Sequence, residues 1–310
     1  MLEVPPDGAV NQQLQTEPSI DNSMVRPSFA IWGEVPLWQV GVLAGLCVWL
    51  YWSTLLHLVG QWWSDPNFSH GFLVPLFSAF VIWQQRDRLA RIRPNPAWGG
   101  AIVLLAGLGL LIVGRLGAEL FLDRSSLLIV LASIIILFLG WNLFRALLFP
   151  WAFMLLMIPI PTILFNQITF PLQLLASKAA AVVLPVMGVP ILREGNVINL
   201  PSMALEVAEA CSGIRSLMSL ITLAIMYGYL MEKRLWVRWL LALASIPIAV
   251  AANSFRIIGT GLLVQYWDAD KAEGYFHASW GWIIFVISLV LLYAVHELVS
   301  FFFPEEIRES

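Results

Sequence analysis

Charge is the scarcest property of this 310-residue chain. Only 12% of its residues are Asp, Glu, Lys or Arg, whereas ordinary soluble domains contain about 25%. Hydrophobic residues make up 59% of the chain, and the mean hydropathy is +0.80. This composition excludes a soluble globular domain and predicts an integral membrane protein that contacts the lipid bilayer. A net charge of −3 without any basic block gives no indication of nucleic-acid binding.

Cysteine is almost missing as well, since the chain has only Cys47 and Cys211. The first lies inside an apolar run and the second in a polar turn, so they predict neither a disulfide framework nor a metal site. Zinc-binding HExxH and nucleotide-binding Walker patterns are also missing, and so is the GxSxG turn of serine hydrolases. We therefore expect no metal and no cofactor.

The N-terminus lacks the basic stretch and short apolar core of a cleavable signal peptide. Its Pro, Gln, Asn and Ser content predicts a flexible cytoplasmic tail over residues 1–34. We expect a polytopic membrane catalytic domain over residues 35–303 and a short cytoplasmic tail over residues 304–310.

Long apolar runs are abundant. A helix needs about 20 mostly apolar residues to cross a bilayer. By this measure the sequence predicts an all-α membrane protein with about eight transmembrane helices, over residues 35–59, 71–83, 99–113, 126–141, 145–161, 211–231, 235–258 and 280–303.

The basic loops predict the orientation. The two densest, residues 86–93 and 233–238, should both be cytoplasmic, which places both termini inside. With this parity the apolar segment 163–187 cannot cross fully. Its Pro171, Gln173 and Lys178 favour a re-entrant or interfacial segment instead.

A short periplasmic hairpin is expected just before the span that begins near Cys211. Gly195 and Asn196 form a turn signal. After them, Leu205 and Val207 alternate with less apolar neighbours, which is typical of strands rather than helices.

Cys211 lies where a polar turn opens into a long apolar helix. The unpaired N–H groups of a helix start favour negative charge and thus a thiolate. Arg215 follows at i+4 on the same helical face and adds a second positive influence. The alternative is a small residue packed at a helix end. Glu209 and Ser212 flank the cysteine, and we expect them to support it, Ser212 as a capping or turn residue.

Three reactive side chains are expected at one membrane face. Cys211 lies about 20 residues before the inner end of its span, and Arg256 about 20 residues after the inner end of the next. His277 precedes Trp280 and Trp282, whose rings suit a membrane interface, and therefore begins the last span on the same outer side.

Arg256 is costly inside lipid, which favours a polar cavity or an anionic partner. Asn253, at i−3, shares its helical face. The alternative is an interfacial arginine that reaches to water, and for His277 it is a structural hydrogen bond. His70 lies in an outer loop with Asp65, and we expect it to order that loop or contact substrate.

A thiol, an imidazole and a guanidinium on one face fit acyl transfer. A thiolate attacks a carbonyl, a cation stabilises the oxyanion, and a proton is returned to the leaving amine. The residues therefore predict a cysteine-dependent acyl-transfer site.

Four motifs carry a resemblance to a known family. They are DPNFSHGFLVP at 65–75, EACSGIRSL at 209–217, NSFRI at 253–257 and GYFHASWGW at 274–282. Together and in this order they resemble the exosortases, bacterial membrane cysteine transpeptidases, and with the span pattern they cover roughly residues 36–303.

The resemblance implies a function. Cys211 would form an acyl-thioester, while Arg256 and His277 would share proton donation and transition-state stabilisation. The substrates would be exported proteins with a C-terminal sorting signal: a Pro-Glu-Pro motif, a membrane helix and a basic end. They would be transferred to an unknown envelope acceptor, often alongside exopolysaccharide production. The enzyme would lie in the bacterial inner membrane with its active site facing the periplasm.

Two rival interpretations remain. A transporter or polysaccharide-handling membrane protein would bind an anionic solute through Arg256, His277 and Lys178. It predicts ionisable groups near mid-bilayer and an internal repeat, and neither is evident. A plain intramembrane protease would pass through the same thioester and release it to water.

Overall fold

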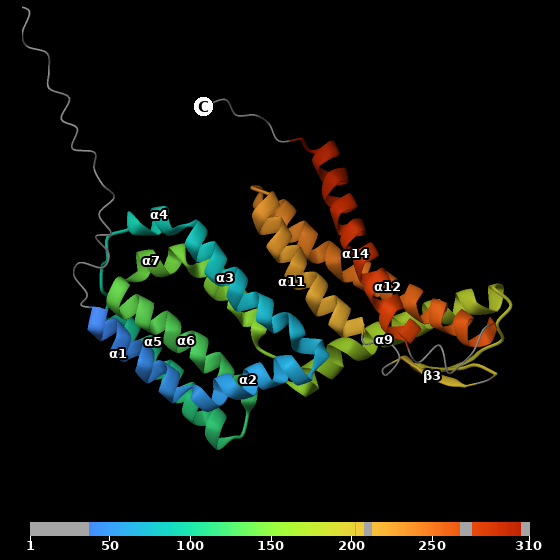
Figure 1. Cartoon of the computed structure of the whole chain (residues 1–310), viewed down its shortest axis with the longest axis horizontal. Coiled ribbons are helices and arrows are strands. Elements are labelled where there is room, and N and C mark those ends of the chain that lie inside the picture. Colours follow the sequence, from blue (N-terminus) through green and yellow to red (C-terminus); the bar gives the residue numbers. More distant parts are fainter. Residues whose placement is uncertain (1–36, 202, 208–212, 267–274, 305–310) are drawn as a thin grey trace, which may run out of the picture.

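The computed structural model describes residues 37–201, 203–207, 213–266 and 275–304. They form helices and one small sheet (Figure 1). In chain order the elements are α1 Leu37–Leu50, α2 Trp52–Ser64, η2 Pro66–Phe72, α3 Leu73–Gln84, α4 Arg86–Ala90, α5 Gly99–Leu116, α6 Leu120–Leu139, α7 Trp141–Ala146, α8 Leu148–Phe153, η3 Met154–Met157, α9 Thr162–Val186, β1 Leu192–Glu194, β2 Val197–Asn199, β3 Ala204–Glu206, α11 Gly213–Met231, α12 Leu235–Tyr266 and α14 Tyr275–Phe302.

The described helices agree with an all-α membrane protein, but they do not confirm the predicted count of eight spans. Five of them are long and apolar enough to cross a bilayer, and α1 with α2 makes a sixth if that bent pair is one span. The predicted spans 71–83 and 145–161 correspond to shorter or broken helices. Pro150 explains one break, because a proline ring clashes with the carbonyl four residues earlier, at Ala146, where α7 ends.

The turn between α5 and α6 departs from the prediction. The predicted spans leave residues 114–125 between them, but the structure places Arg115 in the last turn of α5 and Asp123 and Arg124 in the first turns of α6. Asp123 and Arg124 are buried. The helix can include Asp123 because its carboxylate accepts a hydrogen bond from Thr54 at 2.8 Å and pairs with Arg115.

Glycines let α5 and α6 approach closely. Gly100, Gly107 and Gly114 recur every seven residues on one face of α5, and all three are buried. A Cβ at Gly100 would lie 2.5 Å from the backbone nitrogen of Leu137, and one at Gly114 would lie 2.6 Å from that of Asp123. Small residues at such spacing are typical of helix packing in membranes.

The segment predicted to be re-entrant or interfacial is one continuous helix, α9, of 25 residues. A path that dips into the membrane and returns is therefore wrong. By length and composition α9 can also cross a bilayer. Figure 1 shows it crossing the lower end of α11 obliquely, and it contacts both α11 and α12. Its interfacial placement stays a prediction.

The predicted hairpin is confirmed and gains a third strand. β1 and β2 pair antiparallel around Gly195, whose φ of +65° suits glycine, and β3 pairs with β2. Ser177 of α9 fixes the turn, since its hydroxyl donates to the Gly195 carbonyl at 3.0 Å and accepts from Arg193 Nε at 2.9 Å. The sheet thus packs on α9 immediately before the segment that leads to α11.

Both basic loops lie at one end of the molecule. Figure 1 shows α4, which carries Arg86 and Arg88, at the same end as the turn between α11 and α12, which carries Lys233. The turn between α5 and α6 and the starts of α11 and α14 lie toward the other end. This arrangement fits the predicted parity of the loops, and which end faces the cytoplasm stays a prediction.

Candidate active site

Part of the predicted site lies outside the described residues. This applies to Glu209, Cys211 and Ser212, and to the side chain of His277, whose backbone belongs to the first turn of α14. Cys211 precedes Gly213, the first described residue of α11, by two positions. The roles given to these four residues stay predictions.

Arg256 is the predicted catalytic residue whose side chain the structure describes. It projects from α12 onto α14, where a Cβ on Gly281 would lie 3.2 Å from its Nη2 and 3.3 Å from its Cζ. Gly281 follows His277 by four residues, which is one turn of helix. The guanidinium therefore lies beside α14 one turn after the predicted proton carrier, and glycine provides the room for it.

Arg215, near the start of α11, interacts electrostatically with this guanidinium. Its charge interacts unfavourably with that of Arg256 and favourably with that of Asp65. Arg215 is exposed and lies in the first turn of α11, where the positive end of the helix dipole disfavours a cation. Among the described residues, the charges that act on Arg215 here are thus one arginine and one carboxylate.

Asn253 lies one turn before Arg256 and is buried. The next residue after Arg256, Ile257, belongs to the apolar cluster that joins α12 to α9 and the sheet. Arg256 therefore lies between a polar buried position and an apolar core.

The motif around His70 folds as a short 3-10 helix that contacts α11. Asp65 caps it, since its Oδ1 accepts the backbone N–H of Asn67 at 2.9 Å. His70 is buried, and its Nε2 lies 3.3 Å from the Leu156 carbonyl. Burial lowers the pKa of the His70 imidazole, against the opposing effect of nearby carbonyls. The side chain therefore joins η2 to η3 as a neutral group, and a contact with substrate stays a prediction.

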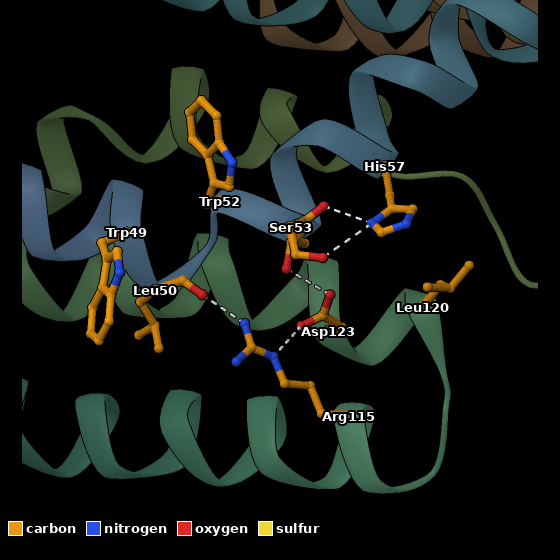
Figure 2. A pocket seen from close by; sticks show the side chains of 9 residues that line it. Trp49, Leu50, Trp52, Ser53, His57, Arg115, Leu120 and Asp123 are labelled. Atoms are coloured by element: carbon orange, nitrogen blue, oxygen red, sulfur yellow. Dashed lines mark hydrogen bonds and ion pairs between the residues drawn. The ribbon is translucent and has the colours of Figure 1, made fainter.

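A second polar site was missed from the sequence. A pocket of about 560 Å³ is lined by side chains from the break between α1 and α2, the end of α5 and the start of α6 (Figure 2). It contains His57, which the sequence shows only near the end of an apolar run, and the ion pair between Arg115 and Asp123. The signal was the presence of Arg115 and Asp123 at the ends of two apolar runs, but nothing in the sequence connects them to His57.

No metal centre is evident in the part of the chain that the structure describes. Within those residues, no three His, Cys, Asp or Glu side chains gather in a group that can hold a metal ion. The polar side chains of the candidate site are instead those of arginine, histidine and asparagine. They suit the binding of anions and developing negative charge.

Comparison with known families identifies the chain. Residues 62–294 match the model of the transmembrane exosortases, and this match covers more than half of the sequence. The chain belongs to the transmembrane exosortase family. The exosortase match runs from the last turns of α2 into α14 and includes η2 and the start of α11 as well as Arg256 and Gly281. Membership supports an exosortase-type function in a membrane. No curated protein and no solved structure matches the chain.

Proposed function

We propose that this exosortase is a membrane-embedded cysteine protease and transpeptidase that acts through an acyl-thioester on Cys211. One observation carries the proposal. The guanidinium of Arg256 lies against Gly281, one turn after His277, and its charge is coupled to that of Arg215, four residues after Cys211. The packing of α11 and α14 on α12 thus supports a shared site for the three predicted catalytic residues.

Cys211 would be the nucleophile. A thiolate is favoured at the start of a helix and beside a cation, and Arg215 supplies positive charge in the first turn of α11. The sulfur adds to the scissile carbonyl, the C–N bond breaks, and the departing amine takes up one proton. The acyl-thioester is then resolved by an acceptor nucleophile or by water, which restores the thiol.

Arg256 and His277 would divide the remaining work. A guanidinium keeps its proton at any physiological pH, so Arg256 is suited to stabilising the oxyanion or binding a carboxylate. An imidazole titrates near neutral pH, so His277 is suited to carrying the proton to the leaving amine. Asn253, Glu209, Ser212 and His70 would support the site.

The substrates would be exported proteins held in the bacterial inner membrane by a C-terminal sorting signal of the Pro-Glu-Pro type. A scissile bond presented at the periplasmic boundary by the substrate's own helix lies at the depth expected for Cys211. Confinement to the membrane also raises its effective concentration. The guanidinium groups of Arg215 and Arg256 are of the kind that binds an acidic residue next to that bond.

The two cysteines provide a matched test. Cys211→Ala is expected to abolish processing of a tagged substrate with a sorting signal, while membrane insertion is unchanged. Cys47→Ala, in the half-buried position of α1, is expected to process at the wild-type rate. Hydroxylamine should release a substrate adduct from the wild type and from Cys47→Ala, but not from Cys211→Ala. Continued processing by the Cys211 variant excludes the thiol mechanism, and the mass of the product separates hydrolysis from transfer.

A further inference from the structure

The break between α1 and α2 forms a pocket that the proposed chemistry does not use. The two helices meet at Tyr51 with a bend of 66°, and the pocket of about 560 Å³ lies at this bend. A break in a membrane helix exposes backbone carbonyls, which is tolerated where they are bonded or line a cavity. Here both conditions hold, so the break and the pocket belong together.

The polar wall of the pocket is the ion pair between Arg115 and Asp123, in which one guanidinium nitrogen remains available to a ligand. Arg115 Nη2 donates to the freed carbonyl of Leu50 at 2.6 Å, and its Nε lies 3.5 Å from Asp123 Oδ1 (Figure 2). Thr54 donates to the other carboxylate oxygen at 2.8 Å. The third nitrogen of Arg115, Nη1, has no hydrogen bond within the described part of the chain. Capping Leu50 therefore accounts for one guanidinium nitrogen and leaves another available.

The apolar wall consists of tryptophan rings that protein does not cover. Trp49 and Trp52 are 78% and 57% exposed, and they lie on either side of the break. Exposed indoles are typical of the boundary between hydrocarbon and headgroups. Leu46 on α1 and Ile112 on α5, which precede the pocket residues Trp49 and Arg115 by about one turn, are also exposed. The pocket thus opens onto faces that suit acyl chains.

The charges of the pocket select the class of ligand. A cation beside a carboxylate forms a dipolar site, which matches neither a simple anion nor a simple cation. A phosphate with an attached ammonium group matches both charges, and an ammonium group is also attracted to the face of an indole. We propose that this pocket binds the headgroup of a zwitterionic phospholipid from the leaflet at the α5–α6 end. The phosphate accepts from Arg115 Nη1 and the hydroxyl of Ser53, and the ammonium group lies between Asp123 and the indoles.

This site is separate from the exosortase chemistry. The pocket residues on α1 and α2 precede residue 62, where the family match begins. No step of the proposed acyl transfer involves them. Lipid binding at this site therefore does not depend on Cys211. An inactive Cys211 variant can be used to test it.

Native mass spectrometry of the detergent-purified full chain tests the proposal. Phosphatidylethanolamine, phosphatidylglycerol and inorganic phosphate are added separately at matched concentrations. One phosphatidylethanolamine is expected to remain bound, about tenfold more tightly than phosphatidylglycerol. Inorganic phosphate in tenfold excess is expected not to displace it. Displacement by inorganic phosphate, or equal retention of both lipids, overturns the proposal.

Matched tryptophan variants locate the binding. Trp49→Ala and Trp52→Ala are expected to weaken phosphatidylethanolamine binding about tenfold while leaving both side chains of the Arg115–Asp123 ion pair in place. Trp38→Ala on α1 and Trp63→Ala on α2 remove rings that are 67% and 85% exposed but lie outside the pocket, and they are expected to leave binding unchanged. An equal loss of phosphatidylethanolamine binding in all four variants would assign the lipid to the general protein surface and overturn the proposed pocket site.

Arg115→Gln tests the phosphate contact. It is expected to reduce binding about tenfold, whereas Arg115→Lys retains part of it because a charge remains. Since the glutamine variant also loses the contact with Leu50, its unfolding temperature is measured alongside. A folded glutamine variant that binds like the wild type overturns the assignment of the phosphate to Arg115.

Discussion

Gly281 lies directly under the guanidinium of Arg256, so close that a Cβ there would stand 3.2 Å from Nη2. The contact is between α14 and the flexible end of a side chain from α12. A methyl group at this position would displace the guanidinium by a few tenths of an ångström without disturbing the backbone. Catalysis depends on such placement more steeply than folding does.

Gly281→Ala is therefore expected to reduce substrate processing about tenfold at unchanged expression. The measurement is the initial rate of substrate cleavage in membranes with equal amounts of enzyme. Gly228→Ala is the control, because its Cβ would meet Arg238 Cα at an ordinary 3.4 Å. Wild-type activity of the Gly281 variant would argue against a catalytic role for the position of Arg256.

Gly100→Ala is expected to destabilise the packing of α5 on α6 by about 1–3 kcal/mol. Its Cβ would lie 2.5 Å from a backbone nitrogen of Leu137, which cannot move as a side chain can. The measurement is the unfolding temperature in detergent. Gly109→Ala, on the same helix with nothing within 4 Å of the new Cβ, is expected to be neutral or slightly stabilising. Equal unfolding temperatures for both variants would contradict the close packing.

Glu232 stabilises the turn between α11 and α12 through its charge. Its side chain is buried, and Arg234 lies 2.7 Å from Oε2. The hydrogen bond from Arg234 lowers the pKa of Glu232 from 4.5 to about 2, and bonds from the backbone N–H groups of Lys233 and Arg234 add to the effect, against the opposing effect of burial. Because the folded-state pKa is depressed, this stabilisation is present above pH 4.5 and is lost as the pH falls toward 2.

Glu232→Gln is therefore expected to lower the unfolding temperature at pH 7, and its difference from the wild type should shrink below about pH 4.5. Thermal unfolding in detergent across pH 7 to 3 measures this. Asp87→Asn is the control, because that carboxylate is exposed and pairs with Arg86 only at 3.9 Å. A difference that stays constant down to pH 3 would show that the charge of Glu232 is not what stabilises the turn.

Local patterns in the sequence predicted the parts of the fold that depend on local chemistry. The turn at Gly195 and Asn196 specified the hairpin because glycine accepts the positive φ that the turn needs. Hydropathy located the long helices α5, α6 and α12. The span over residues 145–161 is not confirmed as one long helix, because an average over a window does not register how a single proline, Pro150, divides a helix.

Contacts between distant segments could not be predicted from the sequence. Arg215 and Asp65 are 150 positions apart, and their charges interact only because η2 packs against α11. Arg115 and Asp123 lie near each other in the chain, but their pocket exists because α1 and α2 bend at Tyr51. Such contacts follow from the packing of helices, which apolar periodicity alone leaves open.

The division of roles between Arg256 and His277 is testable through pH. If His277 carries the proton, processing should vary with external pH near 6.5, where an imidazole titrates. His277→Gln is expected to lower the rate at least a hundredfold and to remove this pH dependence. Arg256→Lys keeps a cation but loses the planar pair of donors, so it should lower the rate at every pH and leave the dependence in place.

The measurement is the initial rate of substrate cleavage in intact spheroplasts, whose outer membrane face is exposed to the buffer, from pH 5 to 8. Membrane insertion of each variant is checked. Asn253→Ala, one turn before Arg256, is a suitable third variant, since it should change the rate without shifting the midpoint. If the pH dependence survives in His277→Gln and disappears in Arg256→Lys, the assignment is reversed. The proton would then have to pass through the region where Arg256 packs on Gly281, and the imidazole would be the group that binds the oxyanion.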